Sequence, residues 1–178
     1  FGIQSRGGCS CAGPYGHRLL GIDIERSHEF EREIARGCEG IKPGWVRVNF
    51  NYFISEAVFQ FILEAVDLVA TEGWRLLPDY TFDPATGLWR HRAGPPEPPL
   101  SLRDLTYVGG VPSFTAHRHR EPESRLAEHL AEGREILARG AAEPDGPSIA
   151  PGSVDAAFEL LRWFVLPEDV AGEVAARG

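Results

Sequence analysis

The amino-acid sequence predicts an α+β fold in which a small mixed or antiparallel sheet packs on helices and is followed by a β-ribbon and a helical tail. Residues 1–6 and 45–50 have the alternating or β-branched composition that is typical of strands. A long apolar helix pattern begins after Ser55, and two short strand patterns flank a turn sequence at residues 83–87. Together these patterns predict both types of secondary structure in one chain.

Size and charge limit the classes of protein that fit. The chain has 178 residues, of which 43% are hydrophobic, so it is long and apolar enough to bury a core. It carries 18 Lys and Arg against 26 Asp and Glu, a net charge of −8, whereas proteins that bind phosphate backbones usually carry a basic excess. An apolar stretch such as residues 58–69 is interrupted by Gln60, Glu64 and Asp67, so it is no span of about 20 apolar residues. We therefore expect neither a nucleic acid nor a membrane as a partner.

Cysteine, methionine and lysine are all scarce. The odd set of Cys9, Cys11 and Cys38 forms no regular disulfide framework, which favours a reducing, cytoplasmic location. The sequence begins at Phe1 and contains no Met, so we expect it to be part of a longer protein. Because Lys42 is the single lysine, chemistry that uses a lysine amine depends on Lys42 or on protein outside these residues.

Residues 1–77 are predicted to hold the small sheet and three helices. The strand at residues 1–6 ends at a Gly-Gly pair, and the strand at residues 45–50 follows a Lys-Pro-Gly turn. The helices are expected at residues 15–22, at residues 27–37 with Ser27 as N-cap, and from Ser55 onward. The third helix has an apolar face that is expected to pack on the core, formed by Val58, Phe59, Ile62, Leu63, Val66 and Val69.

The rest of the chain is predicted to form two further segments. Residues 78–99 combine a hairpin at residues 80–91, built around an Asp-Pro-Ala-Thr-Gly turn, with a stiff Pro-rich linker. Residues 100–178 are predicted to be a helical extension, with helices at residues 122–139 and 154–166. The predicted boundaries therefore follow residues 77 and 99.

Residues 6–14, Arg-Gly-Gly-Cys-Ser-Cys-Ala-Gly-Pro, place a cation, flexible glycines and thiols in one loop. A nearby positive charge favours the thiolate, which is the nucleophilic form, so Cys11 is a candidate catalytic residue. The cysteines are also interpretable as small half-buried side chains, and a zinc site needs more ligands than one Cys-x-Cys pair supplies. The residues alone leave the first two interpretations open.

The order of residues in this loop, Arg-x-Gly-x-x-Cys-Ala-x-Pro, resembles the active-site cysteine loop of the cysteine desulfurases. These are pyridoxal-phosphate enzymes of the class V aminotransferase fold. The sequence Trp-Val-Arg-Val-Asn-Phe at residues 45–50, followed by Ser55 and the apolar helix, resembles the C-terminal strand and helix of the same family. The two matches stand in the same order as in the family and span roughly residues 1–73.

The resemblance implies roles for three residues. Cys11 matches the nucleophilic cysteine that accepts sulfur from a cysteine substrate, and Arg47 matches the arginine that binds the substrate carboxylate. Arg6 matches the arginine at the base of the loop and is expected to assist in substrate binding. The fork of a guanidinium suits a carboxylate because it donates two parallel hydrogen bonds, although an arginine on a strand also often forms only a surface ion pair. The departures from the family are Cys9, which has no counterpart, and a longer connection between Pro14 and Arg47.

The resemblance also implies a cofactor and partners. The family binds pyridoxal phosphate mainly through a preceding domain, acts on a small amino acid and generally forms homodimers. Lys42 lies in a turn, where an exposed, protonated amine is expected, so we do not expect it to bind the cofactor and the chain alone is not a complete enzyme. The alternative is a non-catalytic protein-interaction module that presents the hairpin around Trp89 and the Pro-rich linker to a partner. A redox protein that uses Cys9 and Cys11 fits less well, because a Cys-x-Cys disulfide closes a strained ring.

Overall fold

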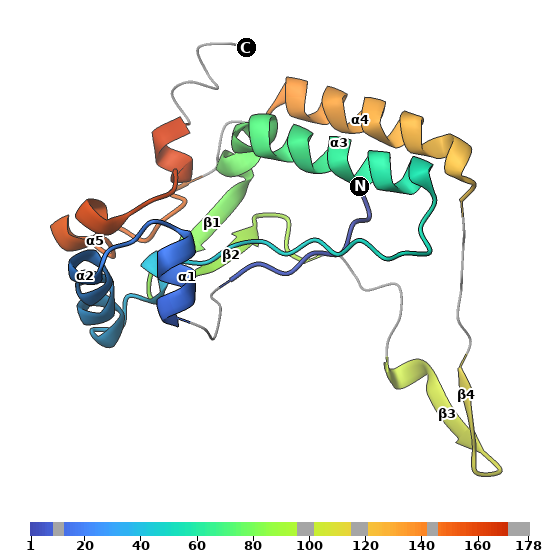
Figure 1. Cartoon of the computed structure of the whole chain (residues 1–178), viewed down its shortest axis with the longest axis horizontal. Helices are drawn as coiled ribbons and strands as arrows, with labels where there is room; N and C mark the ends of the chain where they lie inside the picture. The colour runs from blue at the N-terminus through green and yellow to red at the C-terminus, as the bar shows by residue number, and fades with distance from the viewer. Residues whose placement is uncertain (9–12, 96–101, 115–120, 142–145, 171–178) are drawn as a thin grey trace.

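The computed structural model describes residues 1–8, 13–95, 102–114, 121–141 and 146–170. Within these residues the chain has a mixed α+β fold, with five α-helices and two separate two-stranded antiparallel sheets (Figure 1). The predicted α+β class is therefore confirmed. The sheets are smaller than expected, because each consists of a single hairpin.

The three N-terminal helices lie close to the predicted positions. Helix α1 spans Gly13–Leu19 and α2 spans Ile24–Ala35. The prediction of Ser27 as the N-cap of α2 is wrong, because Asp23 caps the helix by accepting a hydrogen bond from the Arg26 amide at 2.8 Å. Helix α3 spans Glu56–Glu72, and its predicted start is confirmed by Ser55, which accepts a hydrogen bond from the Val58 amide.

Two helices follow in the C-terminal half, α4 at Leu126–Arg139 and α5 at Ala156–Leu161. Helix α5 is shorter than the predicted helix at residues 154–166. Asp155 caps its first turn, and Arg162 already has an extended backbone with ψ of 129°. Short 3-10 turns lie at Glu39–Ile41, Gly73–Asp79, Leu102–Asp104 and Glu123–Arg125.

The first sheet pairs β1 (Tyr80–Asp83) with β2 (Leu88–His91), which confirms the predicted hairpin. The second pairs β3 (Leu105–Val108) with β4 (Val111–Phe114) inside the segment that was predicted to be helical. That prediction is wrong for this part of the tail. Gly109 and Gly110 have φ values of 67° and 79°, and two such residues in a row form the tight turn that closes a two-residue hairpin.

The strands predicted at residues 1–6 and 45–50 are extended but form no regular ladder. They meet at one isolated antiparallel bridge between Arg6 and Arg47. The two segments run side by side below α3 (Figure 1). This bridge brings together two sequence motifs that are far apart in the chain.

Two hydrophobic clusters hold the described residues together. The larger cluster contains Phe30, Ile41, Phe82, Phe158, Leu161 and Leu166. The smaller cluster joins α3 to α4 through Phe61, Ala65 and Leu130. The larger cluster draws side chains from all three predicted segments, whose boundaries at residues 77 and 99 stay a prediction. No helix in the described part of the chain has the length and apolar character needed to cross a membrane.

Candidate anion-binding site

The Arg6–Arg47 bridge is a doubly hydrogen-bonded antiparallel pair. The Arg47 amide donates to the Arg6 carbonyl at 2.8 Å, and the Arg6 amide donates to the Arg47 carbonyl at 3.2 Å. The Trp45 amide continues the pairing by donating to the Gly8 carbonyl at 3.2 Å. Residues that lie directly opposite each other in such a pair project their side chains from the same face. The two guanidinium groups therefore leave the backbone on one side of the ribbon.

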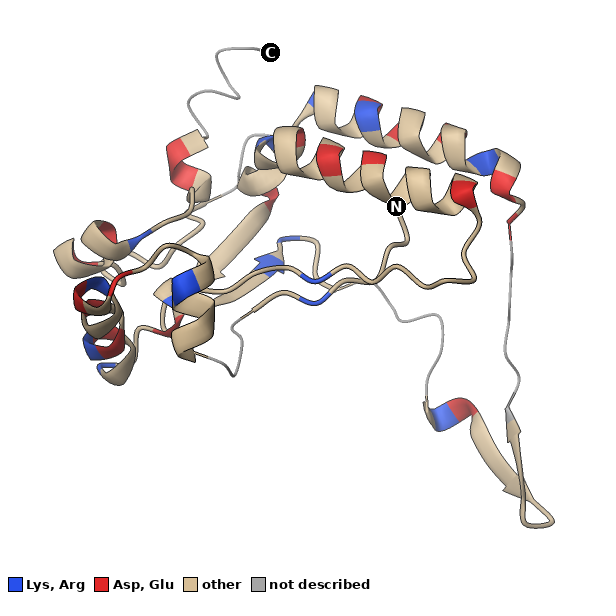
Figure 2. Ribbon diagram, in the orientation of Figure 1, with Lys and Arg blue, Asp and Glu red and all other residues tan. Residues whose placement is uncertain are grey.

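Both arginine side chains are exposed. Within the residues that the structure describes, neither guanidinium has a hydrogen-bond or ion-pair partner. Arg26, Arg36 and Arg75, in contrast, each contact a glutamate three residues away. Like charges directly opposite each other in an antiparallel pair are destabilising, so the Arg6–Arg47 pair favours a bound anion. Figure 2 shows one basic position on each of the two adjacent extended segments.

Trp45 fixes one side of this site. It lies two residues before Arg47 and therefore on the same face of the extended segment. The Arg47 Cζ atom lies 6.0 Å from the centre of the Trp45 ring, within range of a cation–π interaction. The indole also packs on α1, where a Cβ atom at Gly16 would lie only 3.0 Å from the ring. Trp45 thus connects the arginine pair to the helix that follows the cysteine loop.

The predicted cysteine nucleophile cannot be placed in this geometry. Cys9 and Cys11 lie outside the described residues, in the gap between Gly8 and Gly13. The third cysteine, Cys38, packs half-buried against the larger cluster, and burial raises the pKa of its thiol. A raised pKa disfavours the thiolate, so Cys38 is a packing residue rather than a nucleophile.

The described residues contain one lysine, which bears on the cofactor that the resemblance implies. Pyridoxal phosphate needs a lysine amine, and the single lysine, Lys42, forms a surface ion pair with Glu39 at 2.7 Å. Among the described residues there is also no group of three or more His, Cys, Asp or Glu side chains that is able to hold a metal ion. The exposed guanidinium groups of the arginine pair are candidates to bind an anion.

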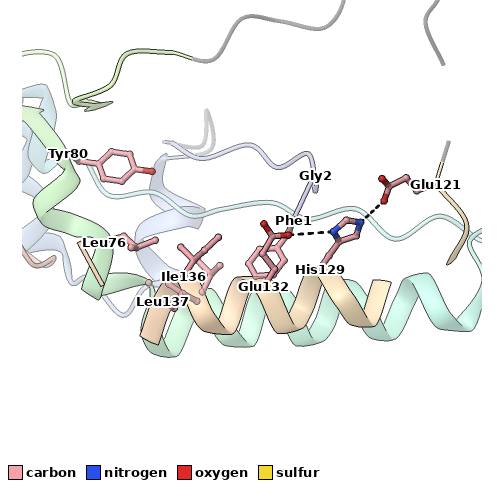
Figure 3. A pocket seen from close by; sticks show the side chains of 12 residues that line it. Phe1, Gly2, Leu76, Tyr80, Glu121, His129, Glu132, Ile136 and Leu137 are labelled. Carbon is pink, nitrogen blue, oxygen red and sulfur yellow. Dashed lines mark hydrogen bonds and ion pairs between the residues drawn. The ribbon is translucent and has the colours of Figure 1, made fainter. Parts of the chain in front are cut away.

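A groove of about 840 Å³ beside α3 and α4 was missed by sequence reasoning. Its floor is apolar, and His129 lies at one end, with its Nε2 atom 2.7 Å from Glu121 and its Nδ1 atom 4.0 Å from Glu132 (Figure 3). In the sequence, the hint of this arrangement was that His129 and Glu132 are three residues apart, a spacing that makes two side chains neighbours on a helix. The Glu121 carboxylate lies within hydrogen-bond distance of the imidazole, whereas the Glu132 carboxylate lies only at the outer limit of an ion pair.

A second hollow of about 780 Å³ lies between α1 and α2. On its wall, His17 Nδ1 and Ser27 Oγ are hydrogen-bonded at 2.7 Å. This bond links the two helices, and Ser27 lies inside α2 because the helix already begins after the Asp23 cap. No carboxylate in the described residues is hydrogen-bonded to His17, so a Ser-His-Asp arrangement is absent there.

Comparisons of the chain with protein-family models, characterised proteins and solved structures give no match. The evidence for a site at the arginine pair is therefore the geometry of this chain alone. It combines two opposed, exposed cations and a flanking indole, next to a loop that contains two cysteines in the sequence.

Proposed function

We propose that this chain is the C-terminal part of a pyridoxal-phosphate-dependent enzyme of the class V aminotransferase type, similar to cysteine desulfurases. Arg47 and Arg6 bind the carboxylate of a small amino-acid substrate. The observation that supports this proposal is the Arg6–Arg47 bridge. The two arginines belong to two separate motifs of the resemblance, and the fold places them directly opposite each other with no acidic partner in the described residues.

The proposed chemistry assigns simple tasks to the residues of this chain. Arg47 donates two hydrogen bonds to the substrate carboxylate, and the Trp45 ring limits the directions in which its side chain points. Pyridoxal phosphate, bound by protein outside these residues, supplies the electron sink for reactions of the amino acid. Cys11 is the proposed sulfur acceptor. Its thiolate forms an S–S bond with the substrate sulfur as the substrate C–S bond breaks, and protonation of the β-carbon yields alanine and a Cys11 persulfide.

The complete protein that contains this chain provides the test. After addition of pyridoxal phosphate, its absorbance spectrum is expected to show a bound-cofactor band that changes with L-cysteine or another amino acid. Arg47→Gln is expected to keep the band and to raise the amino-acid concentration needed for the change, because the carboxylate loses its main contact. Arg32→Gln, which removes an exposed charge from α2, is the control and is expected to behave as the wild type. Absence of a cofactor band overturns the proposal.

The sulfur-transfer step has its own test. With L-cysteine and a thiol reductant, the complete protein is expected to release sulfide, and Cys11→Ala is expected to abolish the release while the cofactor band remains. Unchanged sulfide release in this variant excludes Cys11 as the acceptor. The cytoplasmic location and the homodimer belong to the same proposal.

A second candidate function is a non-catalytic interaction module. The β3–β4 hairpin favours this function, because it exposes apolar side chains. Tyr107 is 66% exposed, Val108 is 78% exposed and Val111 is 66% exposed. Residues 105–114 also carry no charged side chain. Trp89 was the expected contact residue, but its ring packs on Phe82 with 4.6 Å between the ring centres, so β3–β4 is the more open surface. If the complete protein shows no cofactor band, the interaction module becomes the preferred function.

A further inference from the structure

We propose that β3 forms an antiparallel pair with β3 of a second copy of this chain, so that two β3–β4 hairpins join into one four-stranded sheet. The juxtaposition that carries this inference is an open outer edge on β3 beside an outer edge on β4 that contains Pro112. The inference goes beyond the proposed function, because it assigns a self-association surface that uses neither the arginine pair nor the cofactor.

The turn of the β3–β4 hairpin determines which backbone groups point away from it. Its two glycines have φ values of 67° and 79°, as in a type I′ turn, which is closed by a hydrogen bond between the flanking residues. Val108 and Val111 flank the turn and therefore form a hydrogen-bonded pair. Because hydrogen-bonded and non-hydrogen-bonded pairs alternate, the next pair, Tyr107 and Pro112, is non-hydrogen-bonded. The backbone groups of both residues are therefore directed outward, on the two opposite edges of the hairpin.

These two outer edges differ in their capacity to add a strand. Proline has no N–H group, so Pro112 removes the donor that another strand needs at this point of β4. The edge of β3 keeps the Tyr107 amide and carbonyl, together with the Leu105 carbonyl two residues earlier. Within the residues that the structure describes, this sheet has two strands, and Figure 1 shows it projecting away from the helices. A further strand is therefore expected on β3 and not on β4.

A second copy of β3 suits this edge because the strand is complementary to itself. In an antiparallel pair centred on Thr106, the Tyr107 amide of each copy donates to the Leu105 carbonyl of the other. The Tyr107 ring of one copy then lies on the same face as the Leu105 side chain opposite it, and Thr106 lies opposite Thr106 of the second copy. Cross-strand pairs of these types stabilise a sheet.

The charge distribution also favours a second copy. Each chain has a net charge of −8, whereas residues 105–114 carry no charged side chain, so two copies approach here with little repulsion. In the pair centred on Thr106, Asp104 lies opposite Val108 of the second copy, so no like charges meet directly. The contact between two four-residue strands is smaller than the roughly 1,200–2,000 Å² of a stable interface. We therefore expect a dimer that forms at high protein concentration and separates on dilution.

Introduced cysteines test the pairing in the complete protein. In the proposed sheet the two copies of Thr106 lie opposite each other with about 4.5 Å between their Cα atoms, which a disulfide is able to bridge. Thr106→Cys is expected to form a covalent dimer with oxidised glutathione, and mass spectrometry identifies the link between the two introduced thiols. Ser113→Cys is the matched control, because Ser113 pairs with Thr106 within the hairpin but lies on the outer strand, about 14 Å from its copy. It is expected to give about tenfold less of the corresponding link.

Introduced charges provide a second measurement that needs no oxidation. Thr106→Lys places two like charges opposite each other at the centre of the pair, and it is expected to raise the dissociation constant of this dimer about fivefold. Sedimentation velocity over a range of protein concentrations measures this change. Ser113→Lys adds the same charge to the same face of the hairpin, and it is expected to change the dissociation constant by less than about twofold.

The outcomes separate this inference from its alternatives. Equal linkage in Thr106→Cys and Ser113→Cys overturns it, as does equal weakening of association by the two lysine variants. If the edge of β3 binds a strand of another protein instead, Thr106→Cys forms no link with its own copy, which also overturns the inference. A cofactor band without the link at Thr106 overturns this inference alone, whereas the link without a cofactor band overturns the proposed function alone.

Discussion

The two hairpins of this molecule have the same strand length and different surroundings. Strands β1 and β2 have four residues each, as do β3 and β4, and both hairpins turn at glycines with positive φ. In β1, Phe82 is 4% exposed and contacts the rings of Trp89, Phe158 and Phe164. In β3, Tyr107 is 66% exposed. Figure 1 shows β3 and β4 projecting away from the helices, whereas β1 and β2 lie among them.

This difference means that the β1–β2 hairpin adds packing contacts to its strand pairing, whereas the described side chains of β3–β4 are largely exposed. An isolated two-stranded hairpin is marginal in water, and a hydrophobic face or a packed helix is needed to stabilise it. The β1–β2 hairpin has such contacts. The Phe82 amide donates to the Ser148 carbonyl at 2.8 Å, and the Gly40 amide donates to the Pro84 carbonyl at 2.8 Å. A Cβ atom at Gly40 would lie 2.7 Å from the Phe82 ring, so the turn is closely packed.

The largest expected effect is that of Phe82→Ala. Removal of this ring leaves a cavity in the larger cluster, and buried Phe→Ala substitutions usually lower the free energy of unfolding by about 3–5 kcal/mol. Urea unfolding followed by tryptophan fluorescence and circular dichroism measures the change. Leu88→Ala in β2 is the control, because Leu88 is 48% exposed and its removal is expected to cost well under about 1 kcal/mol. A loss below about 1 kcal/mol in Phe82→Ala contradicts the comparison.

The sequence predicted those parts of the fold that depend on local chemistry. Ser55 begins α3 as expected, because an N-cap side chain and the apolar periodicity after it act within a few residues. The β1–β2 hairpin was recognisable from its Asp-Pro-Ala-Thr-Gly turn. The β3–β4 hairpin was missed, although Gly109 and Gly110 form its turn, because a prediction of helix for the whole tail outweighed this short signal.

The sequence predicted which residues belong to the candidate site, but it did not predict how they are arranged in space. Arg6 and Arg47 were identified from two motifs, but their pairing is a tertiary contact that no local pattern encodes. The same limit applies to His129 and Glu121, which lie eight residues apart and meet only because α4 presents His129 toward the chain before it. Asp23 was overlooked as a cap because Ser27, an equally suitable residue type, follows it closely.

A smaller effect is expected from pH at the β1–β2 turn. The Thr86 hydroxyl donates to the Asp83 carboxylate at 2.6 Å, and this hydrogen bond lowers the pKa of Asp83 below its ordinary value of 3.8. A carboxyl whose pKa is lower in the folded state stabilises the fold above its unfolded pKa, and this contribution is lost as the pH falls through the folded pKa. Asp83→Asn is therefore expected to lower the melting temperature at pH 6 and to lose this difference below about pH 4. A difference that is independent of pH excludes the carboxylate as its source.

The smallest expected effect is that of Tyr107→Ala in β3. The Tyr107 ring is largely exposed and lies opposite Pro112 in the register, so its removal creates no cavity. The free energy of global unfolding is expected to change by less than about 0.5 kcal/mol, as for other surface substitutions. Amide hydrogen exchange at residues 105–108 is expected to become faster, because the hairpin opens without unfolding the rest of the molecule. A loss as large as that of Phe82→Ala would instead mean that this hairpin is packed against a surface in solution, and the contrast between the two hairpins would no longer hold.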